Sequence, residues 1–219
     1  GDDARDDTVD AAATPRSESD SKSGSNPSES AAGDAVTASL APTGDVSLAA
    51  VPERVAVYDL LHADLAVAYG HADAVSSLGF DAAVDGATLA AYYERLDGVD
   101  TDWDDLVQLN AGNSGVTVDA GLLYALDSDL HLIDPALVTS FAGWERADVA
   151  AIADDVGPWF GNYYSRTHAD PPAAWADEYA YYTLSDVAKH VADVFHARDR
   201  YESLQAIRSD LLATIDAGL

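Results

Sequence analysis

The residues with the clearest chemical potential lie close together in residues 156–172, which read VGPWFGNYYSRTHADPP. Glycine and proline interrupt this stretch too often for a helix, and several aromatic side chains gather near Arg166. Aromatic rings offer flat contact area, and an arginine can donate two parallel hydrogen bonds to an anionic group. The combination predicts one wall of a binding site for an acidic molecule or a metal chelate. The aromatic residues are Trp159, Phe160, Tyr163 and Tyr164.

Other predicted strand ends add candidate residues from distant parts of the chain. In a parallel α/β sheet, ligands bind beyond the carboxyl ends of the strands. Such ends are expected at YDLL (58–61), GFD (79–81), LNAGNSG (109–115) and IDP (133–135). An alternative for Trp159 and Phe160 is that both simply pack beneath a neighbouring loop. The predicted ligand-binding residues are Tyr58, Phe80, Asn113, Trp159, Phe160, Tyr163, Tyr164 and Arg166, with Asn110 beside them.

The chain carries no catalytic or metal-binding motif, and we expect neither enzyme activity nor a cofactor. It contains no cysteine, no P-loop, and no GxGxxG, GxSxG or HExxH spacing. Asp59, Asp129 and Asp134 stand at predicted strand ends, where catalytic carboxylates can lie. Chance placement is the simpler interpretation in a chain so rich in aspartate. A hydrolase that uses a metal ion held by Asp59, Asp134 or His62 stays open as an alternative.

The charge balance is strongly acidic and excludes one class of partner. Asp and Glu number 39 against 11 Lys and Arg, which gives a formal net charge of −28. Binding to a phosphate backbone needs clustered cations, so nucleic acid is excluded as a partner. Repulsion at this charge opposes folding in dilute buffer, and concentrated salt screens it. The composition is similar to that of proteins from extreme halophiles, and we expect stability to fall as KCl is lowered.

Composition divides the chain into a tether, a lobe and a terminal helix. Residues 1–45 contain no aromatic residue and cannot bury enough apolar area to offset the entropy of ordering, so we expect a disordered tether. In residues 46–197, strand patterns alternate with helix patterns, as in RVAVYD (54–59) followed by LHADLAVAYG (61–70). This alternation predicts an α/β lobe with a parallel sheet. Residues 198–219 are expected to form one long amphipathic helix.

Three segments together resemble a known family. VPERVAVYDLLHADLAVAYGHADAVSSLGF (51–80) resembles the opening of the substrate-binding proteins of ABC importers for metal chelates, namely ferric siderophores, haem and cobalamin. LLYALDSDLHLID (122–134) is similar to the helix, Pro-Asp turn and strand of that family, with Ser128–Asp129 at the Pro-Asp position. GPWFGNYYSR (157–166), followed by YYTLSDVAKHVADVF (181–195), resembles its haloarchaeal branch. The resemblance covers residues 45–219.

The resemblance implies two α/β lobes joined by one long helix, with the chelate held in the cleft between the lobes. This chain would then be the N-terminal lobe and the connector helix, without the second lobe. It would capture a ferric-siderophore-like chelate outside the cell and deliver it to a membrane permease. Residues 1–45 would be a lipoprotein stalk, anchored by a cysteine just before Gly1. One departure is Gly121, where the family often has a glutamate that pairs with permease arginines.

A second hypothesis belongs to a different class of function. The chain could be a single-lobe interaction domain at the cell surface that binds no small ligand. A lone lobe offers only half of the expected cleft, so a small ligand would bind more weakly than to a two-lobed protein. Binding of a ferric chelate by the folded chain would separate the two hypotheses.

Overall fold

The computed structural model describes residues 35–79, 85–99, 102–103, 105–110 and 116–218. All of them belong to the same structural unit, Ala32–Leu219. Two predicted ligand-binding residues, Phe80 and Asn113, lie outside the described residues, as do residues 1–34 of the predicted tether. No helix in the described part of the chain is long and apolar enough to cross a membrane.

A parallel sheet forms the centre of the lobe, as the alternating pattern predicted. β3 pairs with β6 and β4 pairs with β5, both in parallel, and isolated bridges join Val55 to Val75 and His131 to Trp159. The order across the sheet is therefore β5-β4-β3-β6, with residues 158–160 as a further extended segment beside β6. The strands are β3 (Val55–Val57), β4 (Ser77–Leu78), β5 (Val107–Gln108) and β6 (Leu130–Leu132).

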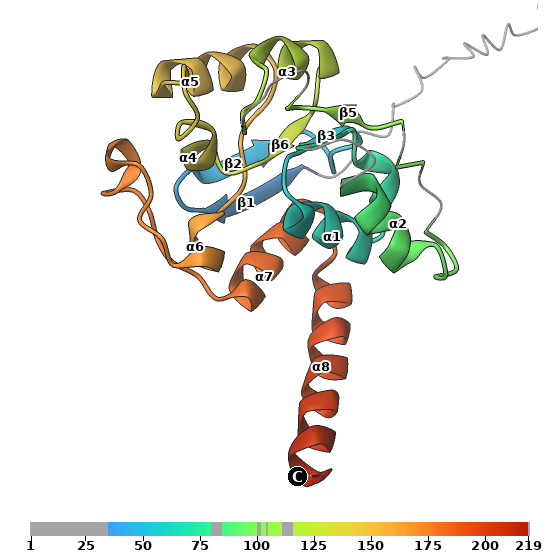
Figure 1. The fold of residues 1–219 in the computed structure, drawn as a ribbon. Coiled ribbons are helices and arrows are strands. Elements are labelled where there is room, and N and C mark those ends of the chain that lie inside the picture. Colours follow the sequence, from blue (N-terminus) through green and yellow to red (C-terminus); the bar gives the residue numbers. More distant parts are fainter. Residues whose placement is uncertain (1–34, 80–84, 100–101, 104, 111–115, 219) are drawn as a thin grey trace, which may run out of the picture. The chain divides into compact units, whose positions relative to one another are not determined.

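Helices connect the strands and cover both faces of the sheet. Figure 1 shows α3 and α5 on one side of β3 and β6, with α1 and α7 on the other. Thr183 is the N-cap of α7 and forms a reciprocal capping box with Asp186. The helices of the lobe are α1 (Leu60–Ala68), α2 (Ala87–Tyr93), α3 (Ala120–Leu126), α4 (Pro135–Val138), α5 (Arg146–Asp155), α6 (Tyr164–Thr167) and α7 (Leu184–Val194), with 3₁₀ turns η1 (Ala72–Ala74) and η3 (Ala173–Trp175).

The strands send successive side chains to opposite faces, which gives the lobe two hydrophobic cores. Val55 and Val57 belong to the core that includes residues of α1 and α7. Ala56, between them, belongs to the core that includes residues of α3, α4 and α5. The same alternation separates Trp159 from Phe160. Because helices cover both faces, β3 and β6 are buried along their whole length, as strands of parallel sheets usually are.

Residues 36–48 form a β-hairpin, so the predicted tether is wrong over residues 36–45. β1 (Val36–Leu40) pairs antiparallel with β2 (Gly44–Leu48), and β1 packs against α7. Burial alternates along β1, where Ala38 and Leu40 enter the core that also contains residues of α1 and α7. The lobe therefore includes β1 and β2, and the boundary predicted at residue 46 is too late in the chain.

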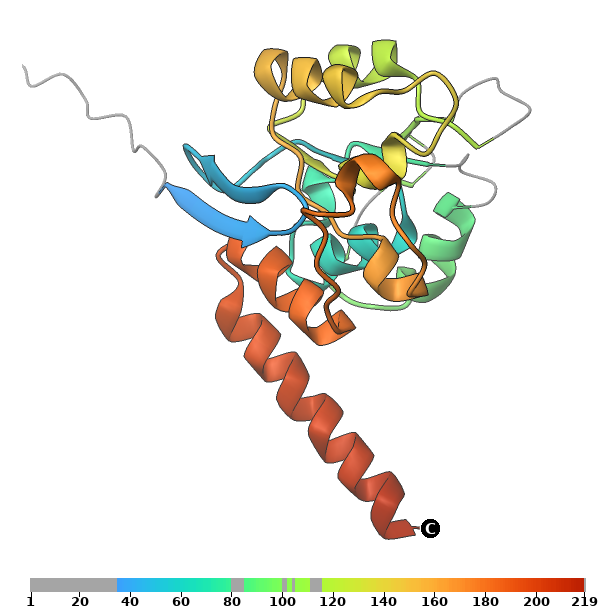
Figure 2. The same ribbon diagram turned by 90° about the vertical axis from the view of Figure 1, so that its left-hand side faces the viewer.

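The last helix, α8 (Arg198–Gly218), confirms the predicted terminal helix. None of its residues is buried, and the side chains of Ile207 and Leu211 are 65% and 59% exposed. Figures 1 and 2 both show α8 running away from the sheet, next to α7. An ion pair between Arg198 and Asp193 closes the junction of these two helices. A role for α8 as a connector to a second lobe stays a prediction.

Candidate ligand-binding site

The strand order changes direction between β3 and β6. The chain passes from β3 to β4 on one side, whereas it passes from β6 to residues 158–160 on the other side. Neighbouring strands whose connections leave in opposite directions create a crevice at their carboxyl ends, where α/β proteins bind ligands. The residues that follow the two strands are 58–59 and 133–134. The topology therefore places the candidate site at these residues.

A pocket of about 320 Å³ opens at this crevice, and we name it the switch-point pocket. It brings together three residues that the sequence predicted as ligand-binding, namely Tyr58, Tyr163 and Arg166. The Tyr58 ring lies 5.6 Å from the Phe141 ring, centroid to centroid. Burial, followed by the charge of Asp85, raises the pKa of Tyr58 to about 12, so its hydroxyl stays protonated. The lining residues are Tyr58, Asp59, Leu60, Asp85, Val116, Leu137, Phe141, Tyr163 and Arg166.

Arg166 and Tyr163 orient each other at the pocket. Arg166 Nη2 donates a hydrogen bond of 3.2 Å to Tyr163 Oη, and the guanidinium carbon lies 4.9 Å from the centroid of the Tyr163 ring. This geometry combines a hydrogen bond with a cation–π contact. No carboxylate in the described part of the chain lies within ion-pair distance of the guanidinium. Since a guanidinium has five N–H donors, Arg166 keeps donors for an anionic ligand.

The side chain of Asp134 is fully buried, and it fixes the position of Tyr163. Its Oδ1 accepts a hydrogen bond of 2.7 Å from the amide of Ala136, which caps α4. Its Oδ2 accepts hydrogen bonds from the Tyr163 amide at 2.7 Å and from the Tyr179 hydroxyl at 2.5 Å. Burial raises the pKa of Asp134 despite these three donors. The carboxylate therefore ties the end of β6 to the segment that carries Tyr163 and Arg166.

Asp59 caps α1 and pairs with a buried histidine. Its Oδ1 accepts hydrogen bonds from the amides of Leu61 and His62, and its Oδ2 lies 2.7 Å from His62 Nδ1. Burial alone would raise the pKa of Asp59, but the charge and hydrogen bonds of His62 outweigh it and lower the pKa. Burial would lower the pKa of His62, but Asp59 outweighs it and raises the pKa. The pair therefore neutralises the Asp59 carboxylate at the pocket.

Trp159 and Phe160 lie in the hydrophobic cores, so the prediction that they face a ligand is wrong. Trp159 is 2% exposed, Phe160 is fully buried, and the Trp159 indole donates a hydrogen bond of 2.9 Å to Val149 O. Consecutive side chains of an extended segment point to opposite faces, and helices cover both faces here. Tyr164 is buried as well, and its amide donates to Tyr179 Oη at 3.0 Å. It does not line the switch-point pocket.

Two glycines allow the segment 158–160 to approach β6. A Cβ atom on Gly157 would lie 2.6 Å from Ser128 O, and a Cβ atom on Gly161 would lie 2.5 Å from Asp134 N. Both distances are shorter than real Cβ contacts, so neither position accepts a larger residue without a shift of the backbone. Gly161 therefore permits the chain to bring Tyr163 to the end of β6.

Sequence reasoning missed several residues of the pocket wall. Phe141 and Leu137 follow the Asp134–Pro135 pair, in which the aspartate is the N-cap of α4 and the proline is its first residue. An aspartate followed by proline is a common sequence pattern at a helix N-terminus, and this pattern predicts a helix directly after β6. Asp85, just before α2, had no comparable signal. Asn110, predicted nearby, is buried and accepts a hydrogen bond of 3.2 Å from the Thr117 amide.

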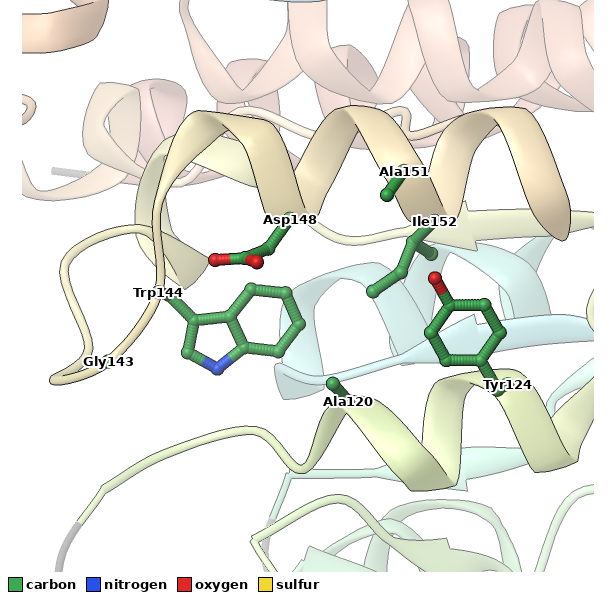
Figure 3. A pocket seen from close by; sticks show the side chains of 7 residues that line it. All are labelled: Ala120, Tyr124, Gly143, Trp144, Asp148, Ala151 and Ile152. Carbon is green, nitrogen blue, oxygen red and sulfur yellow. The ribbon is translucent and has the colours of Figure 1, made fainter.

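A groove between α3 and α5 is smaller than the switch-point pocket, with a volume of about 190 Å³. Figure 3 shows the rings of Trp144 and Tyr124 and the side chain of Ile152 gathered between the two helices. The Trp144 indole donates to Val118 O at 2.9 Å, and the Tyr124 hydroxyl donates to a carboxylate on α5 at 3.3 Å. Because its polar groups are already paired and it lies away from the strand ends, we assign it to helix packing.

The geometry gives no support to the hydrolase alternative. In the ranges that the structure describes, no group of three or more His, Asp or Glu side chains is arranged to hold a metal ion. The oxygens of Asp59 and Asp134 are directed at helix amides, at His62 and at Tyr179. Both carboxylates therefore act as caps and braces in this fold.

Comparison with known proteins gives a likeness of fold. No profile of a known protein family and no curated protein matches the sequence. A periplasmic solute-binding protein from Mycobacterium smegmatis superposes with a TM-score of 0.54 at 16% identity, covering 84% of this chain and 54% of that protein. The petrobactin-binding protein from Bacillus subtilis gives a TM-score of 0.51 at 15% identity, covering 83% and 52%.

A third solved structure is a siderophore-binding protein bound to two molecules of acinetobactin and ferric iron. It superposes with a TM-score of 0.52 at 16% identity, covering 84% of this chain and 54% of that protein. The chain thus spans about half the length of the solved structures that it matches. The described residues have the α/β fold of one lobe of a bilobed periplasmic binding protein.

Proposed function

We propose that this chain is the ligand-binding lobe of an ABC-importer substrate-binding protein that captures a ferric-siderophore-like chelate. The observation that carries the proposal is the switch-point pocket, which Tyr58 lines and where Arg166 lies against the Tyr163 ring with no described carboxylate paired to it. The fold likeness supports it, since two solved proteins with this fold are named for siderophores. A binding role needs no covalent chemistry and therefore no catalytic residue.

Different residues of the pocket would contact different parts of the chelate. The Arg166 guanidinium would donate hydrogen bonds to anionic donor oxygens of the chelate. The rings of Tyr58 and Tyr163 would contact its flat parts. Asp134 holds Tyr163 through its backbone amide, which limits the entropy lost when a ligand orders the site.

Delivery to a membrane permease at the outer face of the cell is the second part of the proposal and depends on the resemblance to chelate importers. Gly121 lies in the first turn of α3, where the family often carries a glutamate. Permease docking through this lobe would then use other side chains. The acidic composition supports a protein that folds and binds its ligand in concentrated salt. The tether predicted before β1 would attach the lobe to a lipid anchor.

Equilibrium dialysis against ferric chelates in molar KCl tests the binding role. The method measures dissociation constants as weak as about 1 mM, or roughly −4 kcal/mol. We expect Arg166→Gln to weaken binding by about tenfold or more, because hydrogen bonds to charged groups contribute about 1.5–3 kcal/mol. Arg208→Gln, on the exposed face of α8, is the matched control and should bind as the wild type does. A folded wild-type protein that retains no chelate would instead support a single-lobe interaction domain.

A further inference from the structure

A second pocket, of about 460 Å³, adjoins the switch-point pocket. Residues of α1 and α2, together with Arg166 of α6, form its walls, and we name it the α1–α2 pocket. Leu60 and Arg166 line both pockets. The two pockets therefore meet at these two side chains, and a ligand group bound to Arg166 has access to both.

The α1–α2 pocket is suited to an apolar or aromatic group. Tyr92 at its edge is 69% exposed, whereas Leu89, one turn earlier on α2, is 1% exposed. An exposed ring beside a buried apolar floor is the arrangement that binds flat or apolar ligand groups. Nothing in the cores requires Tyr92, because a side chain so exposed contributes little to packing.

The charges of the two pockets restrict where a negative ligand group can lie. Arg166 is the one Lys or Arg among their described lining residues, whereas carboxylates line both. Asp59 and Asp85 line the switch-point pocket, and His62 offsets the charge of Asp59. Asp64 lines the α1–α2 pocket, where it accepts a hydrogen bond from Tyr93 Oη. Like charges disfavour an anionic group beside Asp85 or Asp64. A negative group is therefore favoured only at the junction.

We propose that the two pockets form one elongated site, in which Arg166 binds anionic donor oxygens at the junction and an uncharged aromatic or apolar arm lies against Tyr92. This inference rests on the proposed function, and it narrows the ligand to chelates whose negative oxygens lie centrally and whose arms carry no negative charge. A compact chelate without arms would fill the switch-point pocket alone. Affinity should thus depend on the arm as well as on the metal centre.

A matched pair of probes tests the inference in molar KCl. The ferric complexes of acetohydroxamate and benzohydroxamate share the same donor oxygens and differ in a methyl against a phenyl arm. Tyr92→Ala should weaken binding of the benzohydroxamate complex by about three- to tenfold, the size of an aromatic contact. It should leave the acetohydroxamate complex nearly unchanged. Tyr124→Ala removes an exposed helical tyrosine outside both pockets and should change neither affinity.

The outcomes separate the inference from the function on which it rests. If the wild type binds both complexes and Arg166→Gln weakens both, while Tyr92→Ala changes neither, the elongated site is wrong and the binding role stands. If the wild type binds neither complex, the proposed function fails and the inference fails with it. Equal losses for both complexes in Tyr92→Ala would also overturn the inference, because the arm would not be the group that contacts Tyr92.

Discussion

The two halves of the aromatic stretch have different roles in the lobe. Trp159 and Phe160 fill the two hydrophobic cores, whereas Tyr163 and Arg166 line a pocket at the end of the sheet. Gly161 lies between the halves and permits the close passage over β6. Aromatic character alone therefore does not identify a ligand wall. The direction of each side chain relative to the sheet decides whether it stabilises the fold or meets a ligand.

Phe160→Ala should have the largest effect on stability. The substitution removes a fully buried ring from the core that contains residues of α1 and α7. We expect the free energy of unfolding to fall by about 3–5 kcal/mol, as for other buried phenylalanines. Urea titration in molar KCl measures it. A loss below about 1 kcal/mol would contradict the assignment of the first half to the core.

Asp134→Ala should affect both halves, because this carboxylate links the end of β6 to Tyr163. The variant leaves the Tyr163 amide and the Tyr179 hydroxyl without their acceptor, and α4 without its cap. We expect a loss of about 2–3 kcal/mol in unfolding free energy and weaker chelate binding. Tyr179→Phe removes one of these hydrogen bonds and should cost about 1 kcal/mol. Chelate affinity unchanged in a folded Asp134→Ala protein would show that the brace does not position the pocket.

The ion pair between Asp59 and His62 should make stability depend on pH in a defined window. The lowered pKa of Asp59 contributes stability above its ordinary value of 3.8, and this is lost as the pH falls through the folded value. The raised pKa of His62 contributes stability below its ordinary value of 6.5, and this is lost as the pH rises through the folded value. The contribution of the pair is therefore greatest between pH 3.8 and 6.5.

Thermal unfolding of the wild type and of His62→Gln across this pH range measures the contribution of the pair. Subtracting the two curves removes the titration of the many surface carboxylates, which both proteins share. We expect the difference in melting temperature to be largest inside the window and to shrink on both sides. A difference that does not vary with pH would mean that the pair is not ionised in the folded state.

The central fold could be predicted from the sequence because its strands and helices are indicated by short local patterns. The apolar run of residues 54–59 and the helix signals of residues 61–70 and 183–195 correspond to β3, α1 and α7. The hairpin of residues 36–48 was missed because residues 1–45 resemble a disordered tether in composition, whereas Ala38 and Leu40 are buried by contact with a distant helix. Composition alone does not predict the contact between β1 and α7, although apolar and polar residues do alternate along β1.

The candidate site was predicted in part for a related reason. Tyr58 and Arg166 were found because they follow predicted strand ends, and the sheet topology brings those ends together. Trp159 and Phe160 were misplaced because the sequence does not show which faces of the sheet are covered. The residues that hold the pocket in shape, Asp134 and Tyr179, are 45 positions apart, and only the folded chain reveals their hydrogen bond.

Tyr163→Phe, in the second half of the aromatic stretch, should have the smallest effect. It keeps the ring and its backbone bond to Asp134 but removes the hydroxyl that accepts from Arg166. We expect the unfolding free energy to change by less than about 0.5 kcal/mol, since the pair is exposed. Chelate affinity should fall by about two- to threefold, because Arg166 loses an orienting hydrogen bond while its cation–π contact remains. In a protein that already carries Arg166→Gln, Tyr163→Phe should cause almost no further loss of chelate affinity. A fully additive loss of affinity would show that Tyr163 Oη contacts the ligand directly.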